Sequence, residues 1–322
     1  MDKVSAYDYT LPESLIADHP PAERDGARMM VLDRASGSIS HRFVREFPGF
    51  VDDGDLVVLN DTRVIRARLL EPGLEVFLVE HLADRRWRCL VRPGRKFQAG
   101  SHGMVAGAHF VVEEVEADGC RVLLFDTEPD HEHRGHIPLP PYIRRSDEPS
   151  DSARYQTIYA RQDGSVAAPT AGLHFTPGML AKIPHAFLTL HVGLGTFRPV
   201  KVERISEHAM HSEPYSIGAE TADAVNRARR VIAVGTTVTR VLESLPRGPL
   251  TSCEGSTSIF IHPPYEFHRV GALLTNFHLP RSTLLMLVCA FAGREFTLEA
   301  YHEAIRESYR FYSYGDCMLI LS

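Results

Sequence analysis

The stretch "APTAGLHFT", residues 168–176, gathers residue types that can build the wall of a pocket and handle a proton. Pro169 fixes the direction of the backbone, Gly172 permits a turn or a close approach to a ligand, and His174 carries a titratable ring between apolar neighbours. The stretch has neither the periodicity of a helix nor the alternation of a strand. It therefore predicts one wall of a functional site or, as the simpler alternative, a structural histidine packed in the core.

Three further polar clusters stand at the ends of expected strands. They are "HVGLGTFRP" (191–199), "VGTTVTR" (234–240) and "LLTNFHLPRST" (273–283). Loops at the carboxyl ends of sheet strands form the ligand sites of α/β proteins, so we expect all these clusters to converge on one pocket. Each cluster alone is weak evidence for a ligand site. "GLG", for example, lacks the third glycine and the downstream acid of a dinucleotide fingerprint.

The turn Gly235–Thr237 lies between an expected strand and an expected helix that runs to Leu245. Backbone amides and the dipole at a helix start favour a carboxylate or another anion. Capping of the helix by a threonine hydroxyl explains the same residues without any ligand. The sequence leaves both possibilities open.

Metal and disulfide signatures in the sequence are weak. The five cysteines are far apart and never arranged as CxxC, which argues for reduced, mostly buried thiols. "HAMHSE" at 208–213 offers two histidines and a glutamate, but its spacing is not the HExxH pattern that sets two rings on one helical face. We therefore expect no bound metal and interpret these histidines as substrate-facing or structural.

Composition is typical of a soluble globular protein. The chain has 322 residues, 44% of them hydrophobic and 24% charged, with a net charge of −6. The N-terminus lacks the pattern of a signal peptide, and the longest apolar run, 283–293, is too short to cross a bilayer. We expect a cytoplasmic protein in which any contact with nucleic acid is local.

Turn signals divide the chain into an α/β main domain, residues 1–62 and 150–322, and an inserted, smaller all-β domain with a barrel-like pattern at 63–149. The insert is expected to contain strands at 74–81, 87–94, 107–115 and 120–126. Strands of the main domain are expected at 29–34, 54–64, 187–193 and 231–235. Helices are expected at 219–230, 236–245, 283–293 and 298–309.

A basic stretch in the insert is the best candidate for contact with RNA. Its members are Arg85, Arg86, Arg88, Arg92, Arg95 and Lys96, and further along the chain stand Arg144 and Arg145. Phosphate contacts from such residues would be independent of sequence and sensitive to salt. A solvated charged face is the simpler alternative.

Taken together, eleven segments in order along essentially the whole chain resemble the S-adenosylmethionine:tRNA ribosyltransferase-isomerases of queuosine biosynthesis. They include "VVLNDTRVIRARL", "GHIPLPPYI", "SVAAPTAGLHFT", "VIAVGTTVTRVLES" and "YRFYSYGDCMLI". The resemblance implies an α/β domain interrupted by a smaller β-barrel. It also implies transfer and isomerisation of the ribosyl part of S-adenosylmethionine onto a 7-aminomethyl-7-deazaguanine at the wobble position of tRNA, with release of adenine and methionine.

The implied partners are that tRNA and S-adenosylmethionine, which is a consumed co-substrate, without a metal or redox cofactor. We expect a monomer with no membrane contact. Such a reaction needs a base that removes a proton beside the sulfonium, protonation of the leaving adenine and stabilisation of an aldehyde-like oxygen. The first acid–base candidate is His174, and weaker candidates are Asp8, His278 and Asp316.

The resemblance also suggests binding residues. Candidates for holding S-adenosylmethionine are Thr170, Gly172, Gly235, Thr236 and Thr237. Candidates for the base pocket are Asn60, Arg63, Asn276 and Phe277. Candidates for stacking on a base are Phe175 and Phe197, although core packing explains either. An Asx-type turn explains Asn60 equally well.

The sequence leaves two alternative functions open. A tRNA-binding barrel protein without catalysis would depend on the basic stretch and not on His174, Thr170 or Asn276. A methyltransferase would release S-adenosylhomocysteine, but the glycine-rich first loop of such enzymes is missing.

Overall fold

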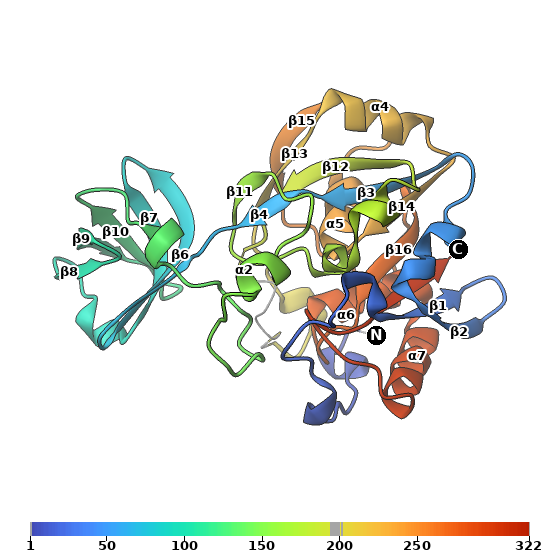
Figure 1. Cartoon of the computed structure of the whole chain (residues 1–322), viewed down its shortest axis with the longest axis horizontal. Coiled ribbons are helices and arrows are strands. Elements are labelled where there is room, and N and C mark those ends of the chain that lie inside the picture. The colour runs from blue at the N-terminus through green and yellow to red at the C-terminus, as the bar shows by residue number, and fades with distance from the viewer. Residues whose placement is uncertain (1, 194–199, 201, 322) are drawn as a thin grey trace.

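Figure 1 shows a computed structural model in which an α/β body carries a smaller β-barrel at one side. The structure describes residues 2–193, 200 and 202–321. The predicted fold class, an α/β main domain with an inserted barrel, is confirmed. In the described part of the chain, no helix is long and apolar enough to cross a membrane.

The main sheet of the body has nine strands over the described residues. Their order is β15 (Cys253–Thr257), β13 (Glu213–Ile217), β12 (His185–Leu190), β3 (Asp55–Asn60), β14 (Arg230–Val234), β16 (Val270–Asn276), β17 (Cys317–Leu321), β1 (Arg28–Asp33) and β2 (Ser38–Phe43). β12, β3, β14 and β16 run parallel to one another. Their carboxyl ends therefore lie at the same edge of the sheet.

Helices cover both faces of this sheet, which explains why its central strands are apolar throughout. Alternate residues of β14 pack on opposite sides, with Val231 and Ala233 in one core and Ile232 and Val234 in the other. The first core is closed by α4 (Ala219–Arg227), α5 (Thr236–Ser244), α6 (Thr283–Ala292) and α7 (Arg294–Arg306). The second is closed by α3 (Pro177–Leu180) and the 3₁₀ helices η4 (Val44–Phe50) and η6 (Thr170–His174).

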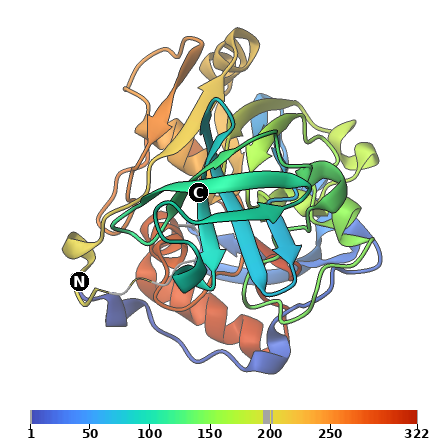
Figure 2. The same ribbon diagram turned by 90° about the vertical axis from the view of Figure 1, so that its left-hand side faces the viewer.

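The barrel is a six-stranded antiparallel sheet that curls until its edge strands lie close together (Figure 2). Its strand order is β5 (Arg68–Glu71), β6 (Leu74–Ala83), β7 (Arg86–Arg92), β10 (Arg121–Phe125), β9 (Ala108–Val115) and β8 (His102–Val105). The four predicted strands are confirmed, whereas β5 and β8, of four residues each, went unpredicted. The limits of the insert at 63 and 149 stay a prediction.

Two neighbouring connections join the barrel to the body. The chain leaves through β4 (Thr62–Val64), which pairs in parallel with β11 (Gln162–Ser165) after the barrel is complete. It returns through α1 (His131–Arg134), an extended proline-rich segment and α2 (Asp151–Arg154). The remaining described 3₁₀ helices are η1 (Val4–Tyr7), η2 (Glu13–Leu15), η3 (Arg24–Gly26), η5 (Gly94–Lys96) and η8 (Ile205–Glu207).

Gly135 should be intolerant of substitution because it lies where the two connections touch. A Cβ there would lie 2.1 Å from the carbonyl oxygen of Arg66 and 2.3 Å from that of His131. We expect Gly135→Ala to lower the free energy of unfolding by about 1–3 kcal/mol, measured by urea denaturation. The control Gly178→Ala, with nothing within 4 Å of the new Cβ, should be neutral or slightly stabilising. Equal stability of the two variants would contradict the close approach.

Candidate active site

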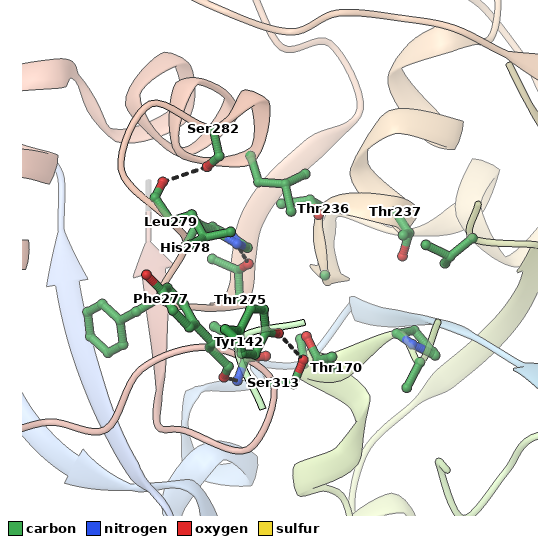
Figure 3. A pocket seen from close by; sticks show the side chains of 18 residues that line it. Tyr142, Thr170, Thr236, Thr237, Thr275, Phe277, His278, Leu279, Ser282 and Ser313 are labelled. Atoms are coloured by element: carbon green, nitrogen blue, oxygen red, sulfur yellow. Dashed lines mark hydrogen bonds between the residues drawn. The ribbon is translucent and has the colours of Figure 1, made fainter. Parts of the chain in front are cut away.

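A cavity lies at the carboxyl edge of the parallel strands, where η6, the start of α5 and the loop between β16 and α6 meet (Figure 3). It is lined by Tyr142, 168–171, Val192, Gly235–Thr237, 275–279, Ser282, Leu284, Tyr312 and Ser313. The predicted convergence of the polar clusters is thus observed. Residues 194–199 of the second cluster, including Phe197, lie outside the described residues.

The cavity is narrow, and its described lining is neutral. It spans about 660 Å³ with its mouth included, but only about 70 Å³ can hold the centres of water molecules, room for about five waters. The walls must therefore move apart to admit a larger ligand. The described lining residues include no Asp, Glu, Lys or Arg, and burial raises the pKa of Tyr142 to about 12. Neutral hydroxyl and amide dipoles make up the polar part of the wall.

The start of α5 offers unsatisfied donors to this cavity. Its N-cap is Gly235, with a φ of 92°, and no side chain caps it, so the threonine cap, one of the two possibilities that the sequence left open, does not form. The first intrahelical bond from a backbone amide is that of Thr239 to Gly235, which leaves the preceding amides free for a ligand. The Thr237 hydroxyl is buried without a partner. This arrangement can hold a carboxylate.

His278 is the predicted acid–base residue that lines the cavity. Its Nε2 lies 2.8 Å from the Thr275 hydroxyl. Its backbone amide donates to the Tyr301 hydroxyl at 3.0 Å and is therefore not available to a ligand. Burial lowers the pKa of His278 to about 3. The ring is therefore neutral at physiological pH and has a lone pair available to receive a proton.

His174, the first acid–base candidate, does not belong to the described lining. The ring is buried behind η6, 3% exposed, and its Nε2 lies 3.3 Å from the side-chain nitrogen of Asn276. Burial lowers the pKa of His174 to about 4. The structure thus places His174 behind the wall and Asn276 in it.

The two aspartates predicted for acid–base work are held by structural partners outside the lining. Asp316 accepts hydrogen bonds from the backbone amides of Arg28 at 2.7 Å and Arg310 at 2.8 Å, and its burial raises its pKa. Asp8 pairs with Arg281 at the surface, with Nε 2.7 Å from the carboxylate. Asp316 therefore ties β1 to the turn before β17.

Two base-pocket candidates lie elsewhere. Asn60 forms an Asx turn, since its carbonyl oxygen accepts from the amides of Thr62 at 3.1 Å and Leu190 at 3.0 Å. Arg63 is exposed, 3.6 Å from Asp163, and lines a separate hollow between barrel and body. These positions make Asn60 a link between strands and leave Arg63 facing the barrel.

Close packing explains the remaining aromatic and glycine candidates. A Cβ on Gly172 would lie 2.1 Å from the Tyr159 hydroxyl, so glycine is required for the fit of η6. Phe175 is fully buried against Phe47, with ring centroids 5.5 Å apart, as the core-packing alternative describes. Phe277 borders the cavity but is itself buried in an aromatic cluster.

Most of the candidate RNA-binding cations have partners within the protein. The ion pairs are Arg86 with Glu113, Arg88 with Glu116 and Asp118, Arg144 with Glu13, and Arg145 with Asp151. Arg85 and Lys96 donate to backbone carbonyls. Arg92 and Arg95 are exposed, without a carboxylate partner among the described residues. Contact between this stretch and tRNA stays a prediction.

Three lining residues, Tyr142, Tyr312 and Ser313, were not predicted from the sequence. Tyr142 and Ser313 bring their hydroxyls within 2.5 Å of each other, and the Tyr142 ring packs on Tyr312 at 4.6 Å between centroids. They come from the segments "LPPYI" and "YSYG", far apart in the chain. The available signals were the proline directly before Tyr142 and the cluster of tyrosines around Ser313.

The fold and cavity define an α/β protein with a small-ligand site at the carboxyl edge of its sheet. The family described as queuosine biosynthesis protein matches residues 4–320. The S-adenosylmethionine:tRNA ribosyltransferase-isomerase of Thermotoga petrophila is 47% identical, covering 99% of this chain and 100% of that protein. That of Pelobacter propionicus is 49% identical, covering 98% and 99%.

A solved structure agrees with these matches. The crystal structure of S-adenosylmethionine tRNA ribosyltransferase from Thermotoga maritima is 39% identical and superposes with a TM-score of 0.58, covering 98% of this chain and 100% of that one. The chain therefore belongs to the family of queuosine biosynthesis proteins.

The two buried histidines should make the fold sensitive to acid. With pKa values of about 4 for His174 and about 3 for His278, both stay neutral when folded while the unfolded chain binds protons below about pH 6.5. Stability is therefore lost as pH falls from about 6.5 toward 4, by about 2 kcal/mol per histidine at pH 5. Urea denaturation at pH 7.5 and 5.0 should show a smaller loss in His174→Gln or His278→Gln. Exposed His102→Gln is the control, and an unchanged loss in both buried-site variants would refute the assignment.

Proposed function

We infer that the chain is an S-adenosylmethionine:tRNA ribosyltransferase-isomerase. It transfers and isomerises the ribosyl part of S-adenosylmethionine onto 7-aminomethyl-7-deazaguanine at the tRNA wobble position, giving epoxyqueuosine and releasing adenine and methionine. The observation that carries this inference is identity near 47% along the whole chain with proteins of that name. The cavity, whose described lining includes no Asp, Glu, Lys or Arg, supports it by offering one site where a cationic substrate and a base can meet.

The start of α5 is our proposed site for the methionine carboxylate of S-adenosylmethionine. Free amides at Thr236 and Thr237, the helix dipole and the unpartnered Thr237 hydroxyl all favour a negative group there. Thr170, on the opposite wall, faces the same space. The sulfonium then lies within the cavity, between this helix start and the loop after β16.

His278 is our proposed acceptor for the proton removed beside the sulfonium. Among the described lining residues it is the side chain with an unprotonated basic nitrogen, a weak base whose pKa is about 3, whereas the tyrosines are already protonated and their pKa values are raised. Its Thr275 contact orients the ring. His174, Asp8 and Asp316 lack such access.

The partners and setting follow from the reaction. We place it in the cytoplasm, where tRNA and S-adenosylmethionine meet, and we take one chain as the active unit because its own segments form the whole described cavity. The exposed cations Arg92 and Arg95 on the barrel are the proposed first contacts for tRNA phosphates.

Product analysis tests the function. Incubation with S-adenosylmethionine and tRNA that carries the aminomethyl base should release adenine and methionine in equal amounts and attach a cyclopentyl group to the tRNA. Release of S-adenosylhomocysteine would indicate a methyltransferase, and tRNA binding without adenine would indicate a binding protein. The same tRNA lacking the aminomethyl group is the control and should yield no product.

Substitutions at the proposed carboxylate site and at the proposed proton acceptor should have different effects on the steady-state constants. Thr237→Val removes a hydroxyl from the proposed carboxylate site and should raise the KM for S-adenosylmethionine about tenfold with little change in kcat. His278→Leu removes the proton acceptor and should lower kcat by about 10²–10⁴ with a smaller change in KM. Adenine release provides the rates. The reverse pattern, or normal turnover by His278→Leu, would refute these roles.

A further inference from the structure

The side-chain amide of Asn276 is oriented by groups behind the cavity wall. Its nitrogen donates to the backbone carbonyls of Tyr312 at 3.2 Å and Asp316 at 3.3 Å, and it lies 3.3 Å from Nε2 of His174. An amide nitrogen carries two hydrogens, so these three acceptors use its full capacity. Two carbonyl partners also settle which amide atom is the nitrogen.

The oxygen of the same amide has no partner. Oδ1 of Asn276 is buried without a hydrogen bond, although the residue itself lines the cavity. Two of the three groups around the nitrogen, His174 and Asp316, lie outside the described lining, and the third, Tyr312, borders it. The oxygen lies on the other side of the amide from all three. A buried acceptor without a donor costs about 1–3 kcal/mol, which a ligand with a suitable hydrogen would recover.

The ring of His174 maintains this orientation. The backbone of Arg24 acts to raise the pKa of His174, against the larger effect of burial, as a nearby carbonyl does. A neutral imidazole has one N–H, and with that hydrogen on Nδ1 the Nε2 atom is an acceptor for Asn276. If His174 were absent, the amide nitrogen would lose one of the three groups that hold it.

We propose that Asn276 Oδ1 accepts a hydrogen bond from the 6-amino group of adenine in S-adenosylmethionine, and that His174 is a positioning residue that keeps this oxygen turned toward the cavity. The proposal rests on the proposed function. An amino group only donates and a carbonyl only accepts, whereas the cavity hydroxyls can do both. Asparagine commonly pairs with adenine through both amide atoms, and here the carbonyl half alone is available.

The surroundings of Asn276 suit a purine. Leu279 and Leu284 contribute apolar side chains to the lining of the same cavity as the proposed carboxylate site at α5. A purine edge at Asn276 and a carboxylate at Thr237 would place the two ends of one substrate beyond the ends of the neighbouring strands β16 and β14.

A substrate analogue tests the contact directly. The probe is S-adenosylmethionine whose purine carries hydrogen in place of the 6-amino group, and the readout is kcat/KM for release of the purine base with the aminomethyl tRNA. We expect Asn276→Ser to lower kcat/KM about tenfold for S-adenosylmethionine, mainly through KM, and to change it less than about twofold for the analogue. Equal losses with both substrates, as contact with the aminomethyl group would give, would overturn the proposal.

Variants of His174 test the positioning role. His174→Leu should show the same discrimination between the two substrates, and it should add no further loss in the Asn276→Ser background. His174→Gln keeps an acceptor and should recover at least half of the loss. An inactive His174→Gln, or additive losses in the double variant, would show that His174 acts independently of Asn276 and would overturn its assigned role.

Asn60→Ser is the matched control. Asn60 is another buried asparagine at the same sheet edge, but its amide is satisfied by Leu190 and Thr62, and it does not line the cavity. This variant can lose stability but should leave the ratio of kcat/KM for the two substrates unchanged. Thermal melting checks folding, and if His174→Leu does not fold, Asn276→Ser and His174→Gln decide. A wild type that releases no adenine refutes the proposed function instead of this contact.

Discussion

Four parallel strands, β12, β3, β14 and β16, end at one edge of the main sheet, and this alignment is the constraint on which the cavity depends. Each strand delivers the residues that follow it to the same place. β14 delivers the glycine that starts α5, and β16 delivers Asn276 and His278. Because both faces of the sheet are covered, this edge is where backbone amides and polar side chains can meet a ligand without breaking a core.

The sequence carries most of the fold because its signals are local. Apolar runs of strand length, the helical patterns around them and the turn residues between barrel strands are readable from neighbours in the chain. The same holds for the convergence of the four polar clusters, which needs only the rule that parallel strands end together. Short strands such as β5 are harder, because pairing with β6 and not their own pattern makes them strands.

The role of an individual residue depends on how far its side chain lies from the cavity or the surface, and the sequence alone does not give this distance. His174 and His278 occur in similar apolar and polar surroundings along the chain, yet one lies behind the wall and the other in it. Arg86 and Arg88 stand in a stretch without acids, but antiparallel pairing brings Glu113 and Glu116 beside them. Phe175 follows the same principle, since its partner Phe47 lies on another helix.

The absence of ionised side chains from the described cavity lining would affect the chemistry of the sulfonium ion that we propose is held there. A carboxylate beside the sulfur would bind the cation more tightly, but it would also reduce the electron withdrawal by which that cation acidifies the adjacent C–H bonds. Walls made of neutral dipoles leave this inductive effect undiminished in a medium that screens it poorly. In the proposed site the substrate would thereby activate its own C–H bond, and a weak base such as a buried, neutral imidazole would suffice to remove the proton.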